Sequence, residues 1–394
     1  MDENKKFFVP RILLIVIILA IVLIASIGIL FSITGKKSKE QEKENQIIQN
    51  QIESSKEEKK VDYTYLDEGI AKQELPKVEI GEIAETNSTI DGRIPCFYNP
   101  VIPKGFKAVG IEQDDTIDEK AKWGEQNSYL NGLVIEDEHE NQFVWVPVEN
   151  MDLFKTTDWQ KNTPKGSLND NYIEPLKDEE EEYQKMYYKV KKYGGFYIGR
   201  FETGDLTANR ERTSAINSDS IGIKKYLNAY NYVPYKLSTV DQRQITGAQE
   251  LAINFGKRNN YNTIVTSVVY GVQWDMMLRF IASDVNNVNN SLRWGNYSTS
   301  ELTYTDINKN SYTKTNEEVR LLKTGSSEDT KAKNIYDVAG NLFEWTKETN
   351  GADTRVVRGG CYVANAMQLA ASRYTYTEET SNNAIGFRIS FYIK

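Results

Sequence analysis

The sequence predicts an α+β domain with much irregular structure, preceded by one N-terminal transmembrane helix. Three observations indicate this fold class. Residues Ile12 to Ile33 form an apolar run of 22 residues without a charge. Beyond about residue 78, short strand-like segments alternate with a few amphipathic helical segments. Residues 286–329 are rich in Asn, Ser, Thr and Gly, which is typical of long loops.

The apolar run at residues 12–33 is predicted to cross a membrane. As a helix it would extend about 33 Å, which matches the hydrocarbon thickness of a bilayer. It lacks the shorter apolar core and the small-residue cleavage site of a signal peptide. Basic residues flank both ends in nearly equal number, so the positive-inside rule almost ties. We expect a single-pass cell-membrane protein with a short cytoplasmic tail, residues 1–11, and an extracytoplasmic C-terminal body.

The remaining chain divides into a linker and a globular domain. Residues 34–77 are rich in Lys, Glu, Gln and Ser, which is typical of a solvated stalk. The globular domain is expected to cover residues 78–394. The net charge of −8 offers no basic surface for nucleic acid, so no nucleic-acid partner is expected.

Three helices and three strands are predicted within the globular domain. The clearest helix covers residues 178–193, where apolar side chains recur at helical spacing from Tyr183 onward. Its acidic start and basic end suit the helix dipole. Two further helices are predicted at residues 247–255 and 272–281. The strands are predicted at residues 131–135, 141–148 and 196–202.

The supply of histidine and cysteine limits the chemistry. The chain has one histidine, His139, and two cysteines, Cys96 and Cys361. His139 lies in a predicted acidic turn, where an exposed loop residue is expected. Two cysteines do not make a disulfide framework. We expect two unpaired thiols, and a single bridge stays the alternative because the sequence does not set their distance.

Six motifs follow one another in a fixed order through the globular domain. They are FVWVPV (143–148), GGFYIGRFE (194–202), GVQWDMML (271–278), NIYDVAGNLFEWT (334–346), RVVRGG (355–360) and GFRI (386–389). Together, over residues 95–394, they resemble the formylglycine-generating enzyme (sulfatase-modifying factor) family. The resemblance implies a C-type-lectin-like fold. It also implies that Arg358 and Arg388 are paired charges that tie strands together, while Trp345 is expected in the core.

The resemblance implies a structural calcium ion at the sequence DVAGNLFEW. The family's site maps onto the side chains of Asp337 and Glu344 and the carbonyl groups of Gly340 and Leu342. Calcium prefers several oxygen ligands, which two carboxylates and a Gly-containing turn can supply. In the alternative, Asp337 caps a turn and Glu344 pairs with a nearby Arg or Lys.

The residues expected for catalysis are missing from this chain. In the family, two cysteines four and nine positions after RGG bind copper and activate oxygen, and a thiolate pair suits Cu(I). Ala364 and Leu369 stand at those positions here, and Cys361 directly follows Gly360, where Ser is usual. Iron-dependent relatives use three histidines. We therefore expect neither copper nor iron, and a pseudoenzyme rather than a catalyst.

The sequence thus favours a membrane-anchored, extracytoplasmic binding or display module. Its ligand, an unknown protein or glycan, is expected to contact the segment between RGG and GFR. The candidate ligand-binding residues there are Tyr362, Asn365, Arg373, Tyr374 and Tyr376. Tyrosine offers a large contact area with few torsions to restrict, although alternate tyrosines also suit a half-buried strand. Two alternatives stay open: a copper-dependent oxidase converting cysteine to formylglycine in sulfatase-type substrates, or a structural cell-envelope or secretion-assembly component.

Overall fold

The computed structural model describes residues 75–109, 121–125, 127–159, 171–215, 219–237, 246–285, 288–365 and 368–394. The predicted membrane span and nearly all of the predicted stalk lie outside these residues. Residues 74–394 form one contact unit. Within the described ranges, no helix has the length and apolar character that a bilayer crossing requires.

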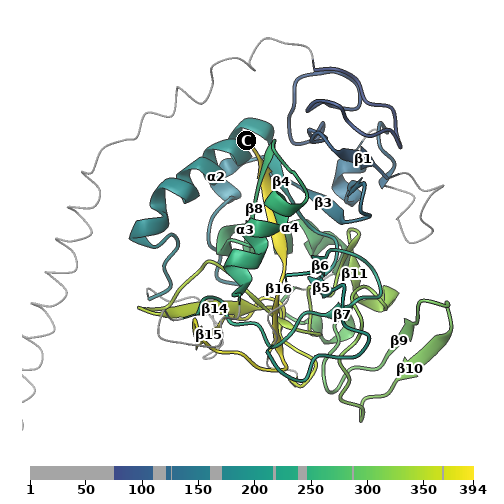
Figure 1. The fold of residues 1–394 in the computed structure, drawn as a ribbon, viewed down its shortest axis with the longest axis vertical. Helices are drawn as coiled ribbons and strands as arrows, with labels where there is room; N and C mark the ends of the chain where they lie inside the picture. The colour runs from purple at the N-terminus through teal and green to yellow at the C-terminus, as the bar shows by residue number, and fades with distance from the viewer. Residues whose placement is uncertain are drawn as a thin grey trace, which may run out of the picture. The chain divides into compact units, whose positions relative to one another are not determined.

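The domain is of the α+β class, with many short strands and few helices (Figure 1). Its main sheet has six strands in the order β1-β2-β3-β4-β17-β8, and every neighbouring pair is antiparallel. The strands are β1 (Phe106–Ala108), β2 (Val134–Asp137), β3 (Gln142–Pro147), β4 (Gly195–Gly199), β8 (Ile264–Val268) and β17 (Ile389–Ile393). The neighbouring internal strands β4 and β17 are buried along their whole length.

Three α-helices are described, and they confirm the three predicted ones. They are α2 (Glu180–Tyr193), α3 (Ala248–Arg258) and α4 (Gly271–Val285), and all three pack against strands of the main sheet. Helix α2 has acids in its first turn and lysines in its last, and it ends where Gly194 takes a φ of 77°. The predicted boundaries differ only at the ends, since a short 3-10 turn, η6 (Lys177–Glu179), precedes α2.

The predicted first strand begins later than expected. Residues Ser128–Asn131 form the 3-10 turn η4, and Gly132 ends it with a φ of 86°. A Cβ atom at Gly132 would lie 1.9 Å from the carbonyl oxygen of Lys333, so only glycine fits here. Strand β2 therefore starts at Val134. It includes Glu136 and Asp137, which were predicted to begin the acidic turn that contains His139.

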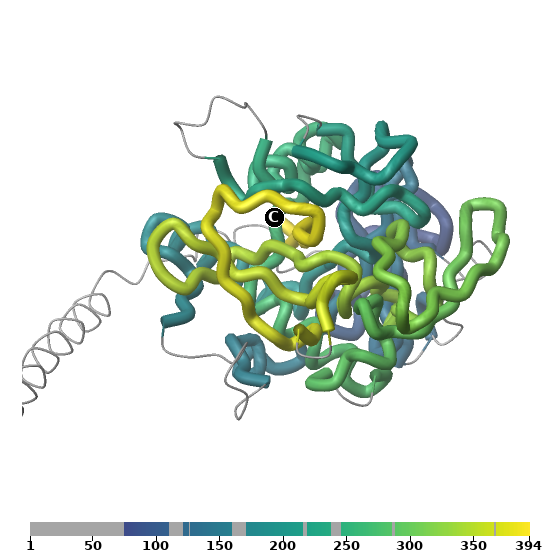
Figure 2. The backbone as a smooth tube through the Cα atoms, turned by 90° about the horizontal axis from the view of Figure 1, so that it is seen from below, coloured from purple at the N-terminus to yellow at the C-terminus, as the bar shows by residue number. Residues whose placement is uncertain are grey.

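A second sheet of four strands carries the three C-terminal motifs. Its order is β15-β14-β13-β16, formed by β13 (Phe343–Trp345), β14 (Thr354–Arg358), β15 (Tyr374–Thr377) and β16 (Ile385–Phe387). The pair β13–β16 is parallel and the other pairs are antiparallel. Figure 2 shows these C-terminal segments running close together. Trp345 has 0% exposure, which confirms its predicted place in the core.

The smaller elements include a hairpin that the sequence did not predict. Residues 286–329 were expected to form loops, yet β9 (Leu302–Thr305) and β10 (Ser311–Lys314) pair as an antiparallel hairpin (Figure 1). Most of its side chains are exposed or half-buried, so no apolar alternation marks it. The other short elements are β5 (Gly204–Asp205), β6 (Ile221–Gly222), β7 (Asn228–Ala229), β11 (Lys331–Ala332), β12 (Ile335–Tyr336), η5 (Met151–Leu153), η7 (Ser291–Arg293) and η8 (Glu328–Thr330).

Candidate functional site

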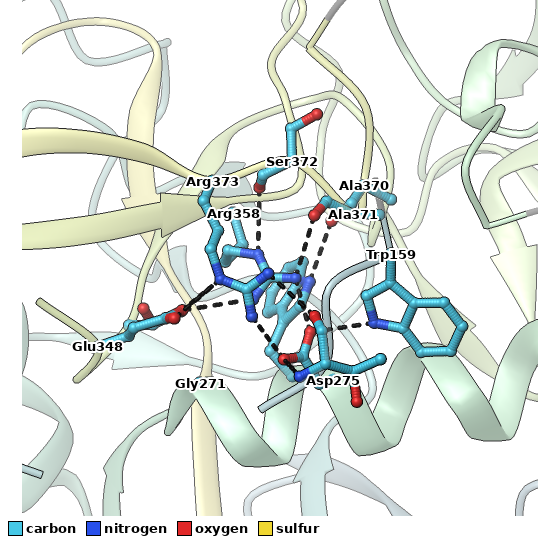
Figure 3. Close-up of polar contacts among 12 residues, drawn as sticks. Trp159, Gly271, Asp275, Glu348, Arg358, Ala370, Ala371, Ser372 and Arg373 are labelled. Carbon is cyan, nitrogen blue, oxygen red and sulfur yellow. Dashed lines mark hydrogen bonds and ion pairs between the residues drawn. The ribbon is translucent and has the colours of Figure 1, made fainter. Parts of the chain in front are cut away.

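A buried network of four charged side chains joins the second sheet to helix α4 (Figure 3). We call Arg358, Arg373, Asp275 and Glu348 the Arg358 network. Arg358 Nη2 lies 2.8 Å from Asp275 Oδ1, and Arg373 Nη2 lies 2.5 Å from Asp275 Oδ2. Arg373 Nε lies 2.8 Å from Glu348 Oε1. All four side chains are at most 1% exposed, and these pairs confirm the structural role predicted for Arg358.

The Arg358 network also closes the base of the loop that follows β14. Arg358 Nε donates to the carbonyl oxygen of Ser372 at 3.1 Å, and its Nη2 donates to that of Ala371 at 3.3 Å. One guanidinium therefore holds residues on both sides of the segment 359–372. Because a buried guanidinium needs fixed acceptors, this arrangement makes the loop base rigid.

Glu174 lies beside this network at the first turn of α4. Its two carboxylate oxygens accept hydrogen bonds from the backbone N–H groups of Gly271 at 2.6 Å and Val272 at 2.8 Å. A Cβ atom at Gly271 would meet Glu348 Oε2 at 2.9 Å and Glu174 Oε2 at 3.1 Å, so the two carboxyl groups converge on this glycine. Burial, followed by the nearby Glu348 carboxylate, raises the pKa of Glu174 to about 8.

A second buried network surrounds Arg388, the arginine of the GFR motif. Arg388 Nη2 lies 2.6 Å from Glu344 Oε1, and its Nε donates to Glu344 Oε2 at 2.9 Å. Its remaining N–H groups donate to the carbonyl oxygens of Gly199 at 2.9 Å and Tyr336 at 2.8 Å. The guanidinium thus ties the second sheet to β4 and β12. These contacts confirm that Arg388 is a paired structural charge.

Two further carboxyl groups belong to this Arg388 network, which we define as Arg388, Glu344, Glu202 and Asp337. Burial, then the carboxylates of Asp337 and Glu344, raise the pKa of Glu202 well above its ordinary value. Burial likewise raises the pKa of Asp337 and of Glu344. One guanidinium therefore faces three carboxyl groups, so the network has excess negative charge unless a proton or a cation balances it.

The predicted calcium ligands lie within or next to the Arg388 network. Asp337 accepts from the Gly325 N–H at 2.7 Å and from Thr330 Oγ1 at 2.8 Å, while both oxygens of Glu344 accept from Arg388. Among the described residues, no three His, Cys, Asp or Glu side chains come together so that they could hold a metal ion. A calcium ion bound here would have to compete with Arg388 for Glu344, and the site stays a prediction.

A pocket of about 430 Å³ opens beside the second sheet, along the segment between RGG and GFR. Its described lining residues are Phe343, Cys361, Val363, Ala364, Asn365, Gln368, Tyr376, Asn382, Asn383, Ala384 and Ile385. Cys361 is 1% exposed, and burial raises the pKa of its thiol to about 11. The thiol is therefore held in its neutral form near the amide of Gln368, whose Oε1 lies 3.9 Å from Sγ.

Four of the five predicted ligand-binding residues lie at or near this pocket. Asn365 and Tyr376 line it. Tyr362 accepts a hydrogen bond at its hydroxyl from Asn383 Nδ2 at 2.8 Å, and the ring centroid of Tyr374 lies 5.5 Å from that of Phe343.

Arg373, the fifth predicted residue, lies in the interior. Its guanidinium is bound by Asp275 and Glu348, and its side chain is 0% exposed. Arg373 is therefore part of the scaffold. Its prediction as a ligand-binding residue was wrong, because its buried side chain has no exposed surface for a ligand to contact.

The sequence missed several residues of the pocket and all the acidic partners of Arg358. Gln368, Asn382 and Asn383 line the pocket, and the Asn-Asn pair just before GFR was a signal that could have found two of them. Asp275 lies 83 residues from Arg358 along the chain, so no local pattern links them.

The two cysteines are both free thiols. Cys96 exchanges backbone hydrogen bonds with Asn99, close to where the Trp145 indole donates to the Phe97 carbonyl oxygen at 2.8 Å. Cys96 is not among the described residues that line the Cys361 pocket.

Comparison with known proteins matches the C-terminal part of this architecture to one family. Residues 273–391 match the sulfatase-modifying factor enzyme 1-like domain. This range runs from α4 into β17. It includes Arg358, Arg388 and the described lining of the pocket. No curated protein sequence matches the chain.

Two solved structures are similar to about half of the chain. The crystal structure of CarF shares 13% sequence identity, covers 51% of this chain and 87% of its own, and has a TM-score of 0.30. Variable protein 1 of Treponema denticola shares 10% identity, covers 50% of this chain and 84% of its own, and has a TM-score of 0.29.

Proposed function

We propose that this chain is a membrane-anchored, extracytoplasmic binding module on a formylglycine-generating-enzyme-like scaffold of the C-type-lectin-like kind, without redox catalysis. The observation that carries the proposal is the pocket beside Cys361. Its described lining offers amide groups, a tyrosine and one neutral thiol, a set suited to hydrogen bonding and packing. The ligand would be a protein or a glycan.

The state of Cys361 argues against its use as a nucleophile. A thiol reacts as its thiolate, which an adjacent base or positive charge normally stabilises. Here burial raises the pKa of Cys361 to about 11, and the described lining of the pocket contains no carboxylate, histidine, lysine or arginine. His139 is in the turn after β2, with its side chain 55% exposed. The thiol therefore acts as a small apolar group in the pocket wall.

The rigid base of the pocket supports a binding role. The Arg358 network fixes the two sides of the loop that carries Cys361, Asn365 and Gln368. A pocket held open before the ligand arrives loses less conformational entropy on binding. The buried arginines of the scaffold would thus support recognition.

A metal and oxygen assay tests the absence of redox catalysis. We expect the purified full-length chain to contain no stoichiometric copper or iron, and to consume no oxygen with a cysteine-containing peptide after incubation with copper. In a thiol titration, Cys361 should react far more slowly in the folded protein than after unfolding, because it is buried and its pKa is raised. Bound copper that protects both thiols, together with oxygen uptake, would replace this proposal with the copper-dependent oxidase.

The anchor is tested separately. We expect the full-length chain to stay in the membrane fraction after alkaline extraction, and deletion of residues 12–33 to release it. A protease added outside intact cells should digest the C-terminal domain. Protection of that domain would reverse the proposed orientation.

A further inference from the structure

We infer that the pocket beside Cys361 binds a neutral carbohydrate, either one sugar unit or the end of a glycan chain. The inference rests on the binding function proposed above and adds the chemical class of the ligand. Three properties of the pocket carry it: the neutrality of its lining, the fixed positions of its amide groups, and its aromatic wall.

The described lining of the pocket carries no charged side chain. A ligand with a net charge would lose its hydration here without gaining a partner of opposite charge, which is unfavourable. The buried Arg358 and Arg373 give no help, because Asp275 and Glu348 already bind them. Cys361 adds no charge either, since burial keeps its thiol protonated. A neutral ligand is therefore favoured.

Four amide side chains supply the polar part of the lining: Asn365, Gln368, Asn382 and Asn383. Each primary amide offers both donors and an acceptor, and a sugar hydroxyl also donates and accepts. Two of these amides are held in place by the protein. Asn382 Oδ1 accepts from the Ala384 N–H at 2.9 Å, and Asn383 Nδ2 donates to the Tyr362 hydroxyl at 2.8 Å. Fixed amides of this kind suit a ligand with several neighbouring hydroxyl groups.

The aromatic wall complements the apolar face of a sugar ring. Phe343 and Tyr376 both line the pocket, with ring centroids 6.4 Å apart and planes inclined by 60°. The C–H groups of a pyranose can pack on such rings. The volume of about 430 Å³ lies within the range of small-ligand pockets.

Two Asn→Asp variants test the inference, because they make the same chemical change at matched positions. Asn382 Oδ1 and Asn150 Oδ1 each accept from the backbone N–H two residues on, at 2.9 Å and 2.8 Å. Aspartate keeps that hydrogen bond in both places. Asn382→Asp, however, removes a donor and adds a charge inside the pocket, whereas Asn150 is exposed at η5 and lies outside its described lining.

The probes are the methyl glycosides of glucose, galactose, mannose and N-acetylglucosamine, with glucuronic acid and a capped diglycine amide for comparison. Binding to the full-length chain is measured by saturation-transfer difference NMR and by slower alkylation of Cys361 in a Cys96→Ser background. We expect at least one neutral glycoside to bind and to protect Cys361. Asn382→Asp should weaken that binding about tenfold, and Asn150→Asp should leave it unchanged.

Several results would overturn the carbohydrate class. They are no protection by any glycoside, glucuronic acid binding as tightly as the neutral sugars, or glycoside binding that Asn382→Asp does not change. If the capped diglycine amide alone binds and responds to Asn382→Asp, the ligand is peptide-like and the binding function stands. Copper uptake with oxygen consumption would instead remove the binding function itself.

Discussion

The two buried arginine networks hold the same scaffold together with different charge balances. The Arg358 network sets two guanidiniums against two carboxylates, and every member has a close partner of opposite charge. The Arg388 network sets one guanidinium against three carboxyl groups, and only Glu344 is paired with it directly. Both networks are almost fully covered by the protein.

The comparison shows that the buried charges around Arg358 and around Arg388 are balanced in different ways. In the Arg358 network, the ion pairs themselves offset the loss of hydration. In the Arg388 network, the carboxyl of Glu202 must hold a proton or face a cation, which agrees with its raised pKa. The charges of the first network are therefore balanced by its own residues, whereas those of the second are not.

The largest effect is expected from Arg388→Met. This change leaves the buried Glu344 carboxylate without its guanidinium, next to the carboxyl groups of Glu202 and Asp337. Breaking a buried pair in this way costs about 3–5 kcal/mol in the free energy of unfolding. Urea unfolding of the full-length chain measures it. The control is Arg320→Met, which breaks an exposed pair with Glu318 and should change the free energy of unfolding by about 0–1 kcal/mol. Equal losses for the two variants would contradict the buried role of Arg388.

A smaller but sharper contrast is expected between Glu348→Gln and Glu202→Gln. Glu348 bears the charge that balances Arg373, so its amide variant should lose about 3 kcal/mol of stability. Burial and the nearby carboxylates raise the pKa of Glu202, and its two oxygens accept hydrogen bonds from Asn341 Nδ2 at 2.7 Å and from the Leu342 N–H at 3.0 Å. Its glutamine variant removes a charge that the other carboxylates repel but also removes one of these two acceptors, so it should lose only about 1 kcal/mol. A larger loss for Glu202→Gln than for Glu348→Gln would reverse the comparison.

Calcium should stabilise the protein if a cation balances the Arg388 network, as the DVAGNLFEW motif predicts. At a hundredfold excess over the dissociation constant, a site specific to the folded state adds about 2.7 kcal/mol. We expect the melting temperature to rise with added Ca²⁺ and to fall in chelator. The Glu344→Gln variant should not respond. Identical melting of the unmodified chain in calcium and in chelator would show that protons alone balance the network.

The pH dependence of stability should come partly from Glu174. The pKa of Glu174 is about 8 in the folded protein, against an ordinary value near 4.5. Between these values the folded state binds the proton more tightly than the unfolded state. Its contribution is therefore fully present below about pH 4.5 and is lost as the pH rises to 8, by up to about 1.4 kcal/mol per pH unit.

A Glu174→Gln variant isolates this contribution. Glutamine removes the titration, so the variant's stability should fall less steeply between pH 5 and 8 than that of the unmodified chain, as followed by thermal unfolding at each pH. The exposed Glu181→Gln variant serves as the control. Parallel curves for all three proteins would exclude Glu174 as a titrating group in this range.

Local sequence patterns predicted the helices, whereas contacts between residues far apart in the sequence could not be predicted from them. Helix α2 was predicted because its apolar spacing and terminal charges lie within 14 residues. The hairpin β9–β10 has no apolar alternation, so nothing in its sequence distinguished it from a loop.

At the candidate site, the sequence predicted that Arg358 and Arg388 are paired but did not identify all their partners. Glu344 is 44 residues from Arg388, and Asp275 is 83 residues from Arg358. The family motifs directed attention to the segment between RGG and GFR, which lines the pocket. They did not reveal that the side chain of Arg373, in the same segment, is buried. Its two partners, Asp275 on α4 and Glu348 just after β13, lie far from it in the sequence.

The position of β17 affects how the domain is made. This strand comes after all the others in chain order, yet it lies between β4 and β8 within the main sheet. Until the ribosome has added β17, β4 is paired in this sheet only with β3, and β8 has no partner strand in it, so the sheet cannot be completed. Long-range pairings of this kind also form slowly. The main sheet can therefore be completed only after its C-terminal strand has been made.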